Sequence, residues 1–244
     1  MRVAVIGGGF SGEAFERALT ERGAEVVRLS RATGFDVLTD DAAASIGEAD
    51  AIIEATGHFT TSRKVAVDFF TRSARNVATA AGKLGAKHVL LSIVNCHLPL
   101  AMEYGYFAGK AEQERVAREE GTNLTIVRST QWFEYPRQNL ERMKFGPIAL
   151  VPAMTIQPVA VDAVAGVLAE VALGSRGGDV VEVAGPGTTT LWDMTKPLEN
   201  KGAAPVPLPI PGAMGKAFRD GLLTPGPDAV IAGPAYGEWL ARQA

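Results

Sequence analysis

The chain has 244 residues, a length that suits one large α/β domain or a nucleotide-binding core with a small lobe. Its formal net charge is −3 and no basic run stands out, which argues against nucleic acid or an anionic membrane as a partner. The single cysteine, Cys96, cannot form an intrachain disulfide, and no apolar run approaches the roughly 18 residues that a membrane span needs. We therefore expect a cytoplasmic protein without a signal peptide or a membrane partner.

The first residues of the chain predict a dinucleotide-binding unit. The apolar run 1–6 is typical of a strand buried on both faces, and it leads into a G-x-G-x-x-G motif and a helix that ends at Gly23. In this order the glycines make a tight turn, let the backbone approach a pyrophosphate, and let the helix pack closely, with its positive end at the phosphates. A glycine turn without a ligand is the alternative. The predicted cofactor contacts in this loop are Gly7, Gly9, Phe10, Ser11 and Gly12.

The end of the second predicted strand, 25–30, indicates which dinucleotide is bound. An NAD site usually carries a carboxylate here for the ribose 2′-hydroxyl. Ser30 and Arg31 occupy this place instead, and a hydroxyl with a guanidinium suits a 2′-phosphate. We therefore expect NADP(H), with NAD(H) as the alternative. Arg28 is nearby, but for Arg28 a solvated surface position is the stronger interpretation.

Two further segments are expected to border the cofactor. A short third strand at 35–38 contains Asp36 and Val37, which could border an adenine, although a turn-capping aspartate is an equal alternative. A fourth strand at 50–55 ends at Thr56 and Gly57. Because ligands bind beyond the carboxyl ends of such strands, both residues are predicted to line the cofactor.

The rest of the chain continues the alternation of strands and helices. Helices are predicted at 65–84, with Val65 on its inner side, and at 106–120, and strands at 87–94 and 124–128. This order predicts a Rossmann-like doubly wound parallel sheet of the α/β class, with its switch point between the first and fourth strands. We expect a single NAD(P)-binding domain, 1–244, in which an irregular C-terminal part forms the substrate-side lobe. That lobe is predicted to comprise residues 131–160 and 186–244, and its proline-rich run 205–211 is expected to be an edge or polyproline segment.

A tyrosine and a lysine carry the predicted chemistry. Tyr106-x-x-x-Lys110 places both side chains on one face of a helix, because four residues are just over one turn. An ammonium beside a phenol favours the phenolate and lowers its pKa from about 10, so that the tyrosine can act as an acid or base. Ser92 is expected to hydrogen-bond a substrate oxygen, and Asn76 to orient the lysine through water. A surface Tyr–Lys pair is the alternative, and no metal site is predicted.

With these motifs the sequence resembles the atypical short-chain dehydrogenase/reductases of the NmrA-like kind. The resemblance rests on the glycine motif, residues 91–94, the Tyr–Lys pair with Glu114 one turn on, and residues 125–131. It continues through three short segments and so spans nearly the whole chain: 156–159, 183–186 and 238–240. Asn95 departs from the pattern, because relatives often have glycine there.

The resemblance implies a Rossmann core, NAD(P) binding and a tyrosine–lysine reaction centre with an upstream serine. Carried over to this chain, Tyr106 gives a proton to a substrate carbonyl, and Lys110 lowers the tyrosine pKa and holds the nicotinamide ribose. Ser92 would steady the developing oxyanion. Some members of this family bind dinucleotide without catalysing a reaction, and their sites usually lack the Tyr–Lys pair.

The substrate is expected at Thr130, Gln131 and Trp132, which follow the strand at 124–128. The side chains available are mostly apolar, which favours a small carbonyl or a quinone as the small-molecule substrate. The leading hypothesis is thus an NADP(H)-dependent oxidoreductase with Tyr106 as general acid/base. Two alternatives stay open: a non-catalytic NADP(H)-sensing regulatory protein, and a nucleotide-sugar epimerase or dehydratase. The oligomeric state is also open, with a homodimer as one alternative.

Overall fold

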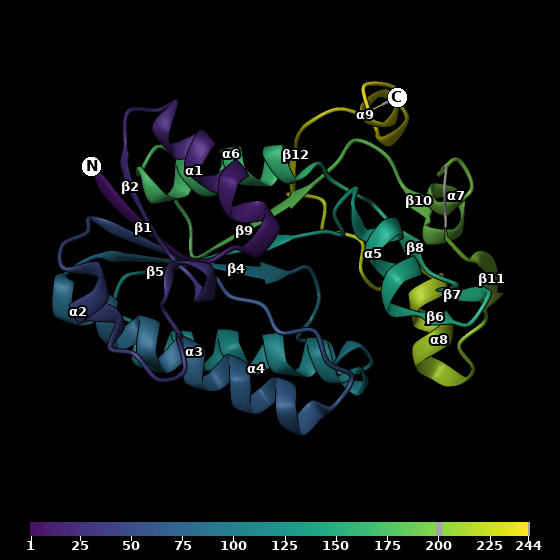
Figure 1. Ribbon diagram of the computed structural model, residues 1–244, viewed down its shortest axis with the longest axis horizontal. Helices are drawn as coiled ribbons and strands as arrows, with labels where there is room; N and C mark the ends of the chain where they lie inside the picture. The colour runs from purple at the N-terminus through teal and green to yellow at the C-terminus, as the bar shows by residue number, and fades with distance from the viewer. Residues whose placement is uncertain (199–201, 244) are drawn as a thin grey trace. The chain divides into compact units, whose positions relative to one another are not determined.

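The structure, a computed structural model that describes residues 1–198 and 202–243, contains a seven-stranded sheet (Figure 1). Its strands are β1 (Arg2–Gly7), β2 (Glu25–Leu29), β3 (Ala51–Ala55), β4 (Lys87–Ile93), β5 (Leu124–Ser129), β9 (Val180–Ala184) and β12 (Val230–Ile231). They lie in the order β12-β9-β5-β4-β3-β1-β2, and β1 pairs in parallel with both β2 and β3. The strand order therefore reverses at β1 and β3, which confirms the doubly wound fold and its predicted switch point.

The chain divides into two compact units. The first unit is Met1–Arg128 with Val161–Val181, and the second is Ser129–Ala160 with Glu182–Ala244. In the first unit, helices cover both faces of the sheet because its central strands are apolar on both sides. One face carries α1 (Gly12–Thr20) and α6 (Val161–Ala172), and the other carries α2 (Ala42–Ile46), α3 (Arg63–Leu84) and α4 (Gly105–Glu120) (Figure 1).

The predicted third strand at 35–38 is wrong, because this segment is a turn. Phe35 and Val37 are buried and the residues between and after them are not, so the segment has the period-two burial of a strand. Its backbone is instead bonded locally. The Asp36 carboxylate accepts from Leu38 N at 2.9 Å, and the Asp40 carboxylate accepts from Asp36 N at 2.8 Å. These side-chain bonds replace the ladder that a strand would form, and β2 is left as the edge of the sheet.

The contact between α3 and α4 is close because glycine lies at the crossing. A Cβ built on Gly109 would lie 2.7 Å from the Phe70 ring and 2.8 Å from the Ala66 Cβ. The inner face of α3 is made of small and aromatic residues, with Phe70 and Ala74 fully buried. The expectation that Val65 belongs to this face is wrong, because Val65 is 45% exposed and the buried residues of α3 begin at Ala66.

We expect Gly109→Ala to reduce the free energy of unfolding by about 1–3 kcal/mol, because the added methyl overpacks this crossing. Gly82→Ala is the matched control, since nothing lies within 4 Å of a Cβ built on Gly82 in α3. Gly82→Ala is expected to raise the free energy of unfolding by about 0.4–1 kcal/mol, because alanine lowers the conformational entropy of the unfolded chain. Urea unfolding of both variants measures the difference, and equal effects would contradict the packing argument.

The second unit contains shorter elements. Its helices are α5 (Tyr135–Arg142), α7 (Leu191–Thr195), α8 (Gly212–Arg219) and α9 (Tyr236–Ala241). Its small sheets are β6 (Lys144–Phe145), β7 (Ile148–Pro152) and β11 (Ala204–Leu208), and β8 (Thr155–Ile156) with β10 (Thr189–Thr190). The proline-rich β11 is at the edge of its sheet, as predicted. Across the described residues of both units, none of the helices combines the length and apolarity needed to cross a bilayer.

Candidate functional site

The glycine loop has the backbone that its motif predicts. Gly7 ends β1 with φ 86°, and a Cβ there would lie 2.7 Å from the Ala55 carbonyl oxygen, so only glycine fits. Gly8 also has φ 86°, and Gly9 has φ 41° with open space beside it. A 3-10 turn (η1, Gly9–Ser11) then leads into α1. The loop therefore presents exposed backbone at the start of a helix, which is the geometry that binds phosphate.

Ser11 and Phe10, in the same loop, differ in burial and in contacts. Ser11 is buried, and its hydroxyl donates to the Gly8 carbonyl at 2.6 Å, so this side chain braces the loop itself. Phe10 is 56% exposed at the tip of the turn. The predicted contacts of both residues with a cofactor stay predictions.

Arg28, which the sequence analysis sets aside, lies beside the glycine loop. Its guanidinium would be 3.1 Å from a Cβ built on Gly12, and it forms an ion pair with Glu16 at 3.0 Å. Its Nε is buried and has no hydrogen-bond partner among the described residues. Arg31 is exposed at the start of a 3-10 turn (η2, Arg31–Thr33), which Ser30 precedes. The interpretation of Arg28 as a solvated surface residue is therefore wrong, because its guanidinium lies against the glycine loop with Nε buried.

The other predicted cofactor contacts are placed as follows. Asp36 caps its own turn, as one of the two interpretations predicts, and the Val37 side chain belongs to the apolar core beneath α3. Gly57 is exposed, with open space around it. Thr56 is 7% exposed, and its hydroxyl contacts Ser73 at 2.9 Å. Only Gly57 among these four presents an open surface at the carboxyl end of a strand.

The Tyr–Lys pair lies on one side of α4. The Tyr106 ring packs edge-on against Phe70 with centroids 5.5 Å apart, and it also meets Phe59 at 6.1 Å. The Lys110 ammonium lies 4.9 Å from the centroid of the same Phe70 ring. The two side chains thus share a neighbour, as their one-turn spacing predicts. Tyr106 is half-buried, whereas Lys110 is only 3% exposed.

The partner of Lys110 is Gln113 and not Asn76. The ammonium donates to the Leu91 carbonyl at 2.7 Å and to the Gln113 side-chain oxygen. The Asn76 amide is held elsewhere, because it donates to the Val37 and Asp40 carbonyls, so its expected role toward the lysine is wrong. Burial lowers the pKa of Lys110, and the nearby carboxylates oppose that change.

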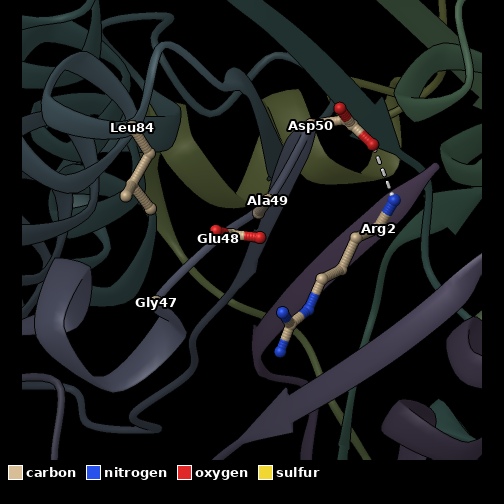
Figure 2. Close-up of a pocket in the computed structure, with 6 residues that line it drawn as sticks. All are labelled: Arg2, Gly47, Glu48, Ala49, Asp50 and Leu84. Carbon is tan, nitrogen blue, oxygen red and sulfur yellow. Dashed lines mark hydrogen bonds between the residues drawn. The ribbon is translucent and has the colours of Figure 1, made fainter.

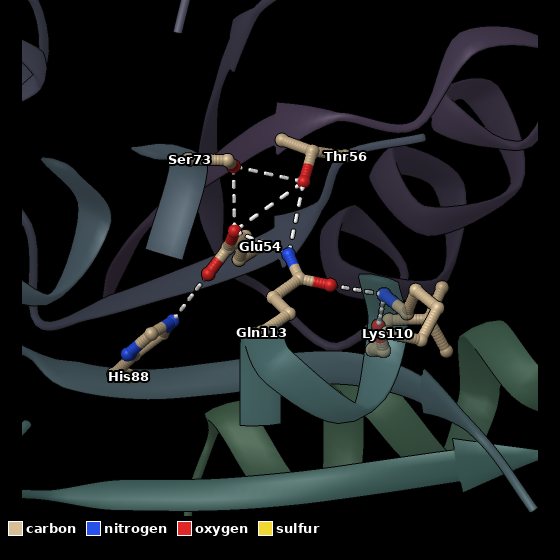
Figure 3. Close-up of polar contacts among 7 residues, drawn as sticks. Glu54, Thr56, Ser73, His88, Lys110 and Gln113 are labelled. Carbon is tan, nitrogen blue, oxygen red and sulfur yellow. Dashed lines mark hydrogen bonds and ion pairs between the residues drawn. The ribbon is translucent and has the colours of Figure 1, made fainter. Parts of the chain in front are cut away.

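Behind Gln113 lies a buried carboxylate that sequence reasoning missed. Glu54, in β3, is fully buried, and its carboxylate accepts from Gln113 Nε2 and from the Ser73 hydroxyl, each at 2.6 Å (Figure 3). Its other oxygen lies 3.0 Å from His88 Nε2. Burial alone raises the pKa of Glu54, but His88, Ser73 and the charge of Lys110 outweigh it and lower the pKa. The carboxylate is therefore held in its charged form.

Ser92 belongs to a second buried cluster in the structure. Its hydroxyl lies 3.6 Å from Cys96 Sγ, which in turn donates to the Glu114 carboxylate at 3.6 Å. Arg128 binds the same carboxylate through two bonds of 2.9 and 2.6 Å. Burial and the Glu114 charge raise the pKa of Cys96 to about 12, so the thiol is unreactive. A contact of Ser92 with substrate stays a prediction.

The loop after Ser92 contains one non-glycine residue in a left-handed backbone conformation. Asn95 has φ 57°, in the left-handed region. Asparagine tolerates this region better than most side chains, so it can replace glycine here.

The predicted substrate residues begin the second unit. Thr130 is 2% exposed, and its hydroxyl oxygen and the side-chain oxygen of Gln131 are buried without a hydrogen-bond partner among the described residues. The indole of Trp132 donates to the Ser129 hydroxyl at 3.1 Å. Buried polar groups normally have partners, so two adjacent ones without them favour a polar ligand or water at this place.

A cavity of about 240 Å³ lies beside the amino ends of two strands (Figure 2). It is lined by Arg2 and Asp50, at the amino ends of β1 and β3, with Leu84 at the end of α3. The Arg2 amide donates to the Asp50 carboxylate at 2.7 Å (Figure 2). Its location at the amino ends of the strands makes it unsuitable as the cofactor site.

Comparison with known proteins shows the fold of this chain but not its family. No protein-family model matches the sequence, and no curated protein matches it. Among solved structures, dTDP-4-dehydrorhamnose reductase from Bacillus anthracis in complex with NADP is similar, with a TM-score of 0.70, 17% identity, and 99% and 96% of the two chains covered.

Two further structures resemble the chain to a comparable degree. The Streptomyces venezuelae dTDP-glucose 4,6-dehydratase DesIV double mutant, with NAD and DAU bound, has a TM-score of 0.71 at 18% identity, covering 99% of this chain and 95% of that chain. UDP-N-acetylglucosamine 4-epimerase from Bacillus cereus has a TM-score of 0.64 at 12% identity, covering 90% and 94%. The chain therefore has the Rossmann-like α/β fold of these enzymes.

Proposed function

We propose that this protein is an NAD(P)-dependent oxidoreductase of the short-chain dehydrogenase/reductase superfamily, with NADP(H) preferred. The observation that carries the proposal lies within the first unit. A glycine loop whose backbone admits no side chain at Gly7 opens α1, and Tyr106 and Lys110 share Phe70 on one side of α4. The fold likeness to a reductase in complex with NADP and to a dehydratase with NAD bound supports an enzyme of this kind.

The residues present fit a nicotinamide dinucleotide. A Cβ on Gly7 or Gly8 would collide with the backbone of Ala55 or Gly12, so the turn needs glycine, and Gly9 leaves open space beside it. Arg28 offers a buried Nε without a partner among the described residues. The loop amides and the start of α1 would hold the pyrophosphate. When bound, the reduced cofactor would supply a hydride to a carbonyl carbon. Tyr106 donates the proton to the carbonyl oxygen, and the Lys110 ammonium favours the phenolate that remains.

The cofactor preference has its own test. We expect Arg28→Ala to weaken NADPH binding by about 10- to 100-fold, because a charge-assisted bond to a phosphate contributes about 1.5–3 kcal/mol. NADH binding should change much less. Arg17→Ala is the control, since Arg17 also lies on this side of the sheet but pairs with Asp162. Calorimetric Kd values measure the effect. Equal losses of affinity for NADPH and NADH would reject a contact between Arg28 and the 2′-phosphate.

The leading substrate is a small carbonyl or a quinone, and one observation favours a second candidate. The buried oxygens of Thr130 and Gln131 suit a substrate that carries hydroxyl groups, and the similar solved structures are sugar-nucleotide enzymes. The second candidate is therefore an enzyme of nucleotide sugars. An apolar quinone would leave both oxygens unpaired, whereas a sugar hydroxyl could donate to them.

NADPH oxidation against matched substrate sets tests the proposal. Small ketones, quinones and 4-keto sugar nucleotides should be compared by kcat/KM, with NAD-loaded protein tested separately for epimerase and dehydratase products. Turnover of carbonyls alone supports the leading substrate, and turnover of sugar nucleotides supports the second. Tight NADP(H) binding without turnover in any set would reject the enzyme and favour an NADP(H)-sensing protein.

A further inference from the structure

The proposed mechanism leaves a buried charge without a role. Glu54 is fully buried on the face of β3 that is covered by α3 and α4, and His88 beside it is fully buried too. Removing a carboxylate from water is costly unless it is paired and hydrogen-bonded. The Glu54 carboxylate is thus expected to have a counter-charge nearby, and the structure offers two: His88 and Lys110.

The Gln113 amide connects Glu54 to Lys110 with a fixed polarity. Its oxygen accepts from the Lys110 ammonium, and its nitrogen donates to Glu54 at 2.6 Å (Figure 3). Its nitrogen also donates to the Thr56 hydroxyl at 3.1 Å. The reversed amide would turn its N–H groups toward an ammonium and its oxygen toward a carboxylate. The observed orientation is therefore the one that an ammonium and a carboxylate on opposite sides dictate.

His88 contacts a different oxygen of the Glu54 carboxylate from the one that Gln113 binds. His88 Nε2 lies 3.0 Å from Oε2, whereas the Gln113 amide donates to Oε1. The other ring nitrogen of His88, Nδ1, is buried with no partner among the described residues. The contact with His88 is therefore separate from the connection that runs from Glu54 through Gln113 to Lys110.

We propose that Glu54 is a positioning residue whose carboxylate, acting through the Gln113 amide, is the counter-charge that holds the Lys110 ammonium in place. What Lys110 then does for the reaction rests on the proposed function. Other ionisable groups face this lysine as well. Glu114 follows it on α4, and Cys96 approaches from the loop after β4. Arg128 of β5 neutralises Glu114 directly, so Glu54 is the carboxylate left for the lysine.

The test reads the charge of Lys110 itself. Lysine labelled with ¹³C at Cε reports its ionisation by NMR, and Lys110→Met assigns the signal. We expect Glu54→Gln to lower the titration midpoint of Lys110 by about 1–3 pH units, because an opposite charge is removed without a change of shape. Ser73→Ala, which removes a hydrogen bond to Glu54 but no charge, is the matched control and should leave the midpoint unchanged.

A second control separates the two candidate counter-charges. His88→Gln keeps a donor toward Glu54 but cannot ionise, so the Lys110 midpoint should stay the same. A higher Lys110 midpoint in His88→Gln, or an unchanged Lys110 midpoint in Glu54→Gln, overturns the proposal. If Glu54→Gln does not fold, Gln113→Met breaks the same connection from the other end and should also lower the midpoint.

Kinetics separate this inference from the proposed function. In Glu54→Gln, kcat for NADPH-dependent reduction should fall at least about tenfold, with the Kd for NADPH unchanged. The alkaline limb of the kcat–pH profile should move to lower pH, because Lys110 then loses its proton at lower pH. A wild type with no turnover in any substrate set rejects the proposed function, whereas the NMR titration still decides the role of Glu54.

Discussion

Replacing Tyr106 by phenylalanine is expected to lower kcat for carbonyl reduction by about 100- to 10,000-fold while the Kd for NADPH stays the same. The phenol is the proposed proton donor, and loss of a positioned general acid has effects of this size. The variant keeps the ring and therefore its contacts with Phe70 and Phe59, so the fold should be unaffected. Stopped-flow turnover and calorimetric binding give the two quantities separately.

Tyr104→Phe is the matched control for this experiment. Tyr104 lies two positions earlier, just before α4, and packs against Phe107 with centroids 5.4 Å apart. Its substitution should leave kcat within about twofold, since Tyr104 is half-buried and phenylalanine keeps the ring that packs against Phe107. Normal turnover in Tyr106→Phe would falsify the assignment of the acid. An equal loss in both variants would point to disturbed packing of the aromatic cluster.

The parts of the site that are local in sequence could be predicted. The strand, glycine turn and helix at the N-terminus follow from apolar pattern and backbone chemistry within 20 residues, and the structure has them at the expected positions. The same holds for the one-turn spacing of Tyr106 and Lys110, since a helix fixes which side chains share a face. Edge placement of the proline-rich β11 also follows from a local property, the missing N–H.

The third strand shows where local pattern misleads. Residues 35–38 alternate between buried and partly exposed, as a strand would, because Phe35 and Val37 reach the core from a turn. What decides the backbone is the pair of carboxylates at Asp36 and Asp40, which bond to nearby amides. Asp36 as a turn cap predicts a turn at this position, whereas the alternation of apolar residues alone predicts a strand.

The buried network could not be predicted from the sequence. Glu54 and Gln113 are 59 positions apart, and Ser73 and His88 lie between them on two other elements. In the sequence Glu54 is an isolated carboxylate within an apolar strand, whereas Ser73 and Gln113 each stand among other polar residues of a helix, so no local pattern links them. Gln113, three positions after Lys110, was the one available signal, because residues at that spacing on a helix are neighbours.

Two residues of the family resemblance, Glu114 and Arg128, have a structural role. Glu114 is 1% exposed on α4. Arg128 of β5 binds its carboxylate in a bidentate pair, through Nε and one terminal nitrogen of the guanidinium. Arg118 adds a third bond of 3.1 Å from a half-exposed position. Burial alone raises the pKa of Glu114, but the hydrogen bonds and charge of Arg128 outweigh it and lower the pKa. The pair thus joins the helix that carries Lys110 to the sheet.

We expect Arg128→Met to reduce the free energy of unfolding by about 3–5 kcal/mol at pH 7, because it leaves a buried carboxylate without its main partner. In the wild type the pKa of Glu114 is lowered, so the stabilisation is present above the unfolded value of about 4.3 and is lost as the pH falls through the folded value. In the variant, burial raises that pKa, and the folded state binds a proton more readily than the unfolded chain. The difference between the two proteins should therefore shrink as the pH falls from 7 toward 4.

Arg118→Met is the matched control, since it removes a 45% exposed arginine from the same carboxylate. A solvent-exposed ion pair contributes about 0–1 kcal/mol, so this variant should lose little stability at any pH. Urea unfolding at pH 7, 5.5 and 4 gives both differences. A loss in Arg128→Met that is constant over this range would mean that the arginine acts through packing of its side chain. The buried charge of Glu114 would then have no part in holding α4 to β5.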